Sequence, residues 1–178
     1  MKTSTKIIGL STIIALALAS MSFLLKPDYT KSSVTFKIKN AGITVDGAFK
    51  TFEAQIDYNE SAQAPSSIKA TIKTESIDTG IEGRDKHLRK EEFFNVAGFP
   101  AITFESSQIL KTATGSFIAE GKLTIKGVAK DIKIPFTYTN GVFEGTVKLN
   151  RLDYGVGGSS LTMGDDVDVF LKVAAAAK

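Results

Sequence analysis

The chain of 178 residues has no cysteine, no tryptophan, a single histidine and only four prolines. Without cysteine it can form neither a disulfide framework nor a thiolate metal site, and it cannot carry a lipid on an N-terminal cysteine. With one histidine as well, a structural zinc site is close to excluded. The hydrophobic fraction of 43% supports a packed interior, so disorder over the bulk of the chain is not expected.

Charge is missing altogether from a long stretch near the N-terminus. Lys2 and Lys6 precede residues 7–25, which carry no charge and include the small residues of Ala17-Leu-Ala19. This pattern is typical of a secretory signal peptide that is cleaved before Ser20. An uncleaved membrane anchor is the alternative, because 19 uncharged residues nearly reach the ~20 that span a bilayer.

We therefore expect three segments: a signal peptide or uncleaved anchor over residues 1–19, a linker over 20–27, and one domain over 28–178. Both interpretations place the domain outside the cytoplasm, periplasmic or secreted, and attached to the membrane if the leader is uncleaved. Removal of residues 1–19 takes away two lysines and lowers the formal net charge from +3 to +1. So small a charge gives no indication of nucleic-acid binding.

After Pro27 the chain alternates apolar and polar residues in short segments, as strands with one wet face do. In SSVTFKIKN, for example, Val34, Phe36 and Ile38 share one face. About eight such segments, nearly all joined by short turns, predict an all-β fold, either an antiparallel sandwich or a barrel.

Glycine, asparagine and proline mark the expected turns and irregularities. Tight hairpins are predicted at Asn40-Ala-Gly42, at Lys126-Gly127 and, most clearly, at Asn140-Gly141. Gly47 suggests a bulge or bend within a long strand. Pro135 is expected at an edge or a bulge, because it cannot donate to a ladder.

One charged segment, EGRDKHLRKEE over residues 82–92, interrupts this strand pattern. It predicts a short surface helix across the end of the sheet, followed by two phenylalanines as anchors. Thr79 and Glu82 fit a capping box, in which each side chain satisfies a backbone donor of the other residue. The pairs Glu82/Lys86 and Asp85/Arg89 have the acid-first spacing of four residues that stabilises a helix.

Several motifs together are similar to those of one family. SIDTG, RDKHLR, FF, FPAITFES, GKLTIKGVAKDIKIPF and RLDYGVGG occur in this order, and the chain resembles the YceI-like family from about Val34 to Val173. The resemblance implies an extended, lipocalin-like antiparallel β-barrel with a long apolar tunnel that holds an isoprenoid or a similar lipid. It also implies an exported protein, and homodimers are common among such proteins.

In such a barrel the alternating apolar residues would face inward and line the cavity. From periodicity alone a solid core is the better expectation, because most apolar stripes merely pack, and it is the resemblance that favours a cavity. The predicted cavity residues are Val34, Phe36, Ile38, Phe52, Ile56, Ile72, Phe104, Leu123, Ile125, Ile134, Phe136, Phe143, Val147, Val169 and Leu171.

Three interpretations of the charged segment remain open. In the first, its charges are a solvated helix face and Phe93 and Phe94 close one end of the core. In the second, Arg84, His87 and Arg89 line the rim and meet a diphosphate or another polar head group, while the two rings gate the tunnel. In the third, the segment is catalytic through Asp85 and His87, but residues two apart on a helix do not face each other.

The remaining motifs give no positive sign of catalysis, a cofactor or a metal. The chain has no G-x-S-x-G elbow and no H-E-x-x-H. The segment from Gly155 to Ser160 lacks the third glycine of a dinucleotide fingerprint and reads as a loop. Asp165, Asp166 and Asp168 lack EF-hand spacing. Arg151 and Asp153 are expected to form a structural ion pair.

The sequence thus predicts a non-enzymatic protein that binds, sequesters or transports an amphiphilic lipid, a polyisoprenoid or an isoprenoid quinone. The expected partners are this lipid, a membrane in transient contact and a second copy of the chain, and no nucleic acid. A secreted enzyme acting on a lipid- or quinone-like substrate in the same cavity is the alternative. A solid β-domain with a structural role is the third hypothesis.

Overall fold

The computed structural model describes residues 22–176, so the predicted leader over residues 1–19 lies outside the described part. The elements are ten strands, one α-helix and two 3-10 turns. In chain order they are β1 Ser22–Asn40, β2 Ile43–Phe49, β3 Phe52–Asn59, β4 Ala64–Lys73, η1 Thr74–Ser76, β5 Ile77–Asp78, α1 Glu82–Leu88, β6 Ala101–Ala113, β7 Ser116–Ile125, β8 Val128–Thr139, β9 Val142–Asn150, η2 Arg151–Tyr154 and β10 Met163–Ala176.

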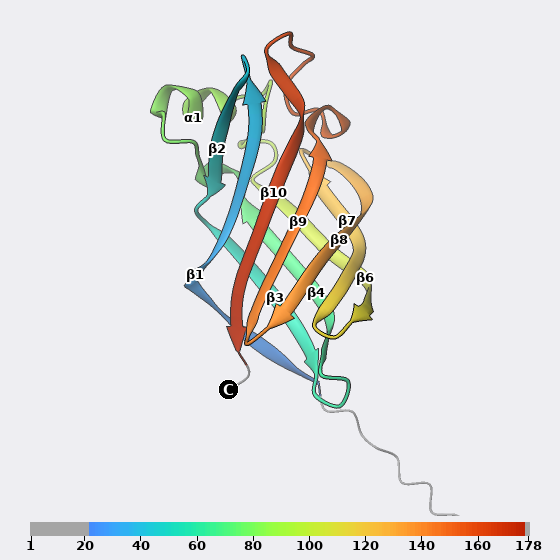
Figure 1. The fold of residues 1–178 in the computed structure, drawn as a ribbon. Helices are drawn as coiled ribbons and strands as arrows, with labels where there is room; N and C mark the ends of the chain where they lie inside the picture. The colour runs from blue at the N-terminus through green and yellow to red at the C-terminus, as the bar shows by residue number, and fades with distance from the viewer. Residues whose placement is uncertain (1–21, 177–178) are drawn as a thin grey trace, which may run out of the picture.

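Eight of the strands close into an antiparallel barrel, which confirms the predicted fold class (Figure 1). Around the barrel the order is β1, β3, β4, β6, β7, β8, β9 and β10, and pairing of β10 with β1 closes the ring. The first residues of β1 pair with β3, and its last seven pair with β2 instead. The short β5 then extends the sheet beyond β2.

The barrel begins earlier than the sequence predicts. Residues 22–25 pair with β3 in regular register, so most of the expected linker over residues 20–27 is in fact part of β1. Leu25 is only 1% exposed and lies opposite Ile56. The linker prediction is therefore wrong for this stretch, because the apolar residues that resemble the end of a leader contribute to the core.

The expected hairpins are present, but one glycine has a different role. Ala41 and Gly42, like the pairs at Lys126 and Asn140, have positive φ at both positions, as two-residue type I′ turns require. Gly47 does not form the expected bulge: it pairs regularly with Phe36, and a Cβ there would overlap the Phe36 ring. The bend lies between β2 and β3 instead.

Pro135 lies where the sequence predicts, whereas helix α1 is shorter than predicted. Pro135 lies just beyond the four-residue ladder between β8 and β9, at a local edge as expected. Helix α1 ends at Leu88, several residues short of the expected end, and Ile81 at its N-cap provides no side-chain cap. The predicted capping box is thus absent, although Glu82 and Lys86 do form their ion pair at 2.6 Å.

The two ends of the barrel differ (Figure 1). At one, which we call the helix end, stand α1, the β1–β2 hairpin and the loop over residues 155–162. At the other, which we call the plug end, lie the start of β1 and the turn between β3 and β4. Within residues 22–176 no helix is both long and apolar enough to cross a membrane.

Candidate functional site

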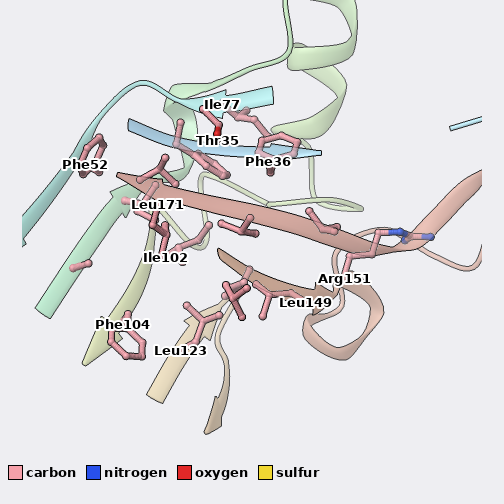
Figure 2. A pocket seen from close by; sticks show the side chains of 18 of the residues that line it. Thr35, Phe36, Phe52, Ile77, Ile102, Phe104, Leu123, Leu149, Arg151 and Leu171 are labelled. Carbon is pink, nitrogen blue, oxygen red and sulfur yellow. The ribbon is translucent and has the colours of Figure 1, made fainter. Parts of the chain in front are cut away.

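A cavity of about 280 Å³ lies inside the barrel (Figure 2). All fifteen residues predicted to face inward line it. The few polar side chains on its wall are those of Thr35, Asn40, Thr79, Arg84, Arg151 and Tyr154. The hypothesis of a solid β-domain is therefore not supported, because the inward side chains leave space between them.

Strand register explains how residues distant in sequence share one wall. Ala54 of β3 lies opposite Ala70 of β4, Ala70 lies opposite Phe104 of β6, and Phe104 lies opposite Leu123 of β7. Because side chains alternate along every strand, residues in one such row all point into the barrel. The row includes two adjacent alanines, which leave room that larger side chains would fill.

Sequence reasoning missed several residues of the wall. Some continue the alternation of strands whose other residues were identified, so the signal was present: Ile68, Ile102, Ile132, Leu149, Val167 and Val173. Val45 and Phe49 alternate with Gly47 along β2, so the signal was present for them as well. Others are brought in by connections or strand ends that have no clear period: Ile77, Leu88, Tyr154, Val156 and Met163.

Aromatic rings close the plug end. The Phe23 and Tyr58 rings lie 5.6 Å apart, Tyr58 lies 5.6 Å from Tyr138, and Tyr138 stacks on Phe143 at 4.2 Å. We call these four residues the aromatic plug. Burial, together with the neighbouring Tyr58, raises the pKa of the Tyr138 hydroxyl. The cavity therefore stops against Phe143 and does not run through the barrel.

At the helix end, the two phenylalanines after α1 complete the wall. Phe93 and Phe94 both line the cavity. They lie at the end of the barrel, as expected if they close the core or gate a tunnel. The Phe94 ring meets Phe49 of β2 edge-on at 5.6 Å. Phe93 packs in the same manner on the imidazole of His87, at 5.0 Å.

Of the three residues proposed for the rim, only Arg84 lines the cavity. Its Nε donates to the hydroxyl of Thr79 and its Nη2 to the Thr79 carbonyl, both at 2.7 Å. The buried carboxylate of Asp85 in turn accepts from the Thr79 hydroxyl and from its backbone N–H. Within the described residues the Arg84 guanidinium has no carboxylate at ion-pair distance and Nη1 has no hydrogen-bond partner.

Arg89 and His87 lie elsewhere, so the structure does not bring them together with Arg84 at the cavity. Arg89 donates to the carbonyls of Glu75 and Ile77, both at 2.9 Å, and thereby ties α1 to the segment before it. The ion pair between Asp85 and Arg89 that the helix spacing predicts is absent, and Arg89 instead contacts the carboxylate of Glu75 at 3.3 Å. The exposed His87 contacts Glu92 at 2.9 Å.

The pKa of Glu92 lies below its usual range, because its carboxylate accepts from a backbone N–H and from the His87 ring. Asp85 and His87 therefore have separate partners, and no acid–base dyad forms between them. Among residues 22–176, no three side chains of the kinds that bind metals gather into a site.

Arg151 is the second charged residue on the wall, and its bonds identify a structural role. Its side chain is 4% exposed and donates to the carbonyls of Val156, Gly158 and Gly164. It pairs with Asp165 at 2.9 Å and not with Asp153, which contacts Lys130. Arg151 thus fixes the loop before β10, and its charge is already neutralised.

Comparisons with known proteins agree with this fold. The model of the YceI-like domain matches residues 25–175. A UPF0312 protein of Azotobacter vinelandii is 31% identical over 151 residues, 79% of each chain. The crystal structure of BcnA from Burkholderia cenocepacia has a TM-score of 0.79 at 28% identity, covering 85% of this chain and 100% of that one.

A polyisoprenoid binding domain from Saccharophagus degradans, described as implicated in plant cell wall breakdown, has a TM-score of 0.58. It is 17% identical and covers 86% of this chain and 98% of that one, a likeness that concerns the fold alone. The family match and the A. vinelandii relative confirm the resemblance that the sequence motifs indicate. The chain belongs to the YceI-like family.

Proposed function

We propose that the protein binds one long-chain lipid of the isoprenoid type in the barrel cavity and sequesters or carries it without altering it. The cavity is the observation that supports this most strongly: its wall is apolar, one end is closed by the aromatic plug, and a cation stands at the other. A polyisoprenoid or an isoprenoid quinone has the matching form, an apolar chain with one polar end. Membership of the family supports the same occupant.

The size of the cavity limits how much of the chain it would hold. The volume of about 280 Å³ is just below the ~300–1,000 Å³ typical of small-ligand pockets. Each buried methylene contributes about 0.8 kcal/mol, so affinity should rise with chain length until the cavity is full. Longer chains would then extend past the helix end, and affinity would reach a plateau.

Arg84 would meet the polar end of the lipid. Its Nε and Nη2 are held by Thr79, which leaves Nη1 available, and a fixed guanidinium suits phosphate oxygens. Arg84→Ala should therefore weaken the binding of a prenyl phosphate about tenfold and leave the uncharged prenol unaffected. Lys86→Ala, on the same helix but away from the cavity, is the matched control. Equal losses for both ligands would contradict the head-group role.

Native mass spectrometry of protein purified from its own host, followed by lipid extraction, tests the function directly. A bound lipid whose mass stays constant through a long incubation supports carriage. A ligand converted to a new product would identify an enzyme acting in the same cavity. Protein that contains no lipid and takes none from micelles would refute both forms of cavity function.

We also propose that the protein acts outside the cytoplasm after its leader is removed. Phe23 and Leu25 belong to β1 and pair with β3, so they cannot at the same time lie in a membrane. That leaves residues 7–21 uncharged, and a helix of this length measures about 22 Å against a hydrocarbon core of ~30 Å. The intact mass of the mature protein tests this, since a chain that retains residues 1–19 would contradict it.

A further inference from the structure

We infer that the helix end of the barrel docks on a lipid bilayer through the side chains of Ile43 and Leu161, so that cargo passes directly between membrane and cavity. This inference rests on the proposed lipid-binding function and names the partner from which the lipid comes. We call Ile43 and Leu161 the docking pair.

Both residues of the docking pair protrude from the protein. Leu161 is 107% exposed and Ile43 is 70% exposed, the two highest values among the large hydrophobic residues in the described part of the chain. Neither side chain is needed for packing, since so little of it is covered. An aliphatic side chain held fully in water gains free energy by entering an apolar phase.

The two residues belong to neighbouring tips that are bonded together. Ile43 begins β2 directly after the turn that ends β1, and Leu161 lies in the loop before β10. The N–H of Ala41 in that turn donates to the carbonyl of Thr162 at 2.8 Å. This bond joins the two tips, the β1–β2 hairpin and the loop before β10, which both stand at the helix end (Figure 1).

The position of Leu161 is fixed by its own loop. The hydroxyl of Ser160 accepts from the N–H of Thr162 at 3.2 Å and from that of Met163 at 3.0 Å. These bonds form a turn around Leu161, whose side chain is fully exposed. A residue presented in this manner does not have to rearrange before it contacts a surface.

The two tips adjoin the cavity. Asn40 pairs with Met163 at the base of the two tips, and both residues line the cavity wall. Directly before α1, the exposed Ile81 follows Thr79 closely in sequence, and Thr79 holds the cavity residue Arg84. Aliphatic side chains therefore project at the end of the barrel where the polar part of the wall lies, opposite the aromatic plug.

The form of the two tips favours a bilayer over a protein partner. A stable protein interface buries ~800 Å² on each side with close packing, which two protruding side chains between polar neighbours do not offer. Single aliphatic residues on narrow tips can enter the acyl region of a membrane without a complementary surface. Lys39 lies beside the tip, and among the described residues no carboxylate is within ion-pair distance of it, so it can contact anionic lipid.

The test compares vesicle binding with lipid binding from micelles. Prenol-free vesicles of phosphatidylcholine and phosphatidylglycerol are floated with the protein. Uptake of a fluorescent prenol is followed separately, from vesicles of the same phospholipids that contain it and from detergent micelles. Leu161→Asp and Ile43→Asp should each reduce flotation and the rate of uptake from vesicles about tenfold. Equilibrium binding of the prenol from micelles should not change.

Leu110→Asp is the matched control, since Leu110 is exposed on β6 toward the plug end. Equal flotation of the wild type, both docking variants and this control would overturn the inference. So would a loss of self-association in the docking variants, because it would assign the tips to a dimer interface. If the wild type floats but takes up no prenol from micelles, the docking stands and the proposed cavity function fails.

Discussion

Replacing Ala70 with leucine should stabilise the empty barrel and at the same time weaken its binding of lipid. Ala70 lies directly opposite Ala54, and both line the cavity, so the added atoms would enter vacant space. The change adds about three buried carbons at ~0.8 kcal/mol each, of which roughly 0.5–1 kcal/mol is offset by lost rotamer freedom. The net gain in the free energy of unfolding is about 1.5 kcal/mol.

The same carbons take space from the ligand. A chain that loses contact for about three methylenes loses ~2.4 kcal/mol, which corresponds to roughly 50-fold weaker binding. Urea unfolding of lipid-free protein, followed by circular dichroism because the chain has no tryptophan, measures the first effect. Titration with a fluorescent prenol in micelles measures the second.

The opposite signs of the two effects make the experiment decisive. Were the wall a close-packed core, the larger side chain would be forced against its neighbours and would cost about 1–3 kcal/mol. A destabilised Ala70→Leu variant with unchanged lipid affinity would therefore refute the vacant cavity. Ala129→Leu, on the outer face of β8, should alter neither quantity and serves as the control.

Three further changes test other parts of the molecule. Leu25→Ala should lower the free energy of unfolding, measured in urea, by about 2–5 kcal/mol. A change near zero would show that residues 22–25 do not belong to the core. The raised pKa of Tyr138 contributes stability that is present below the unfolded pKa of ~10 and is lost as pH rises through the folded pKa. Tyr138→Phe should therefore lose less stability between pH ~9 and ~11 than the wild type, and identical urea curves would contradict this. Phe136→Asp should abolish retention of lipid after gel filtration, whereas Thr137→Asp on the outer face should retain it.

The inner wall was predictable because one rule governs all of its strands. Side chains alternate along each strand between its irregularities, so a phase identified at Val34 predicts Phe36 and Ile38 as inward positions. Turns with positive φ at two successive residues, as at Asn140 and Gly141, then connect neighbouring strands. The fold class and most of the lining follow from these local rules.

Whether the wall encloses space was not predictable from periodicity. That property depends on which residues face each other across strands, and the two small residues Ala54 and Ala70 meet only because of the β3–β4 register. The partners of Arg84, His87 and Arg89 depend in the same way on tertiary structure, since Thr79 and Glu75 lie outside the helix. Of the three residues that helical spacing placed at the rim, only Arg84 therefore lines the cavity.

The boundary at the N-terminus was missed for a different reason, which bears on how the barrel closes. The composition of the uncharged run over residues 7–25 does not separate a leader from a strand, because Phe23 and Leu25 fit the apolar segment of a leader and the core of a barrel equally well. Only pairing with β3 distinguishes them. Since the tilted Phe23 ring also packs on Tyr58 in the aromatic plug, the plug end is completed by a segment whose composition fits a leader as well. If residues 1–19 are a leader, as proposed above, its removal would precede closure of the plug end.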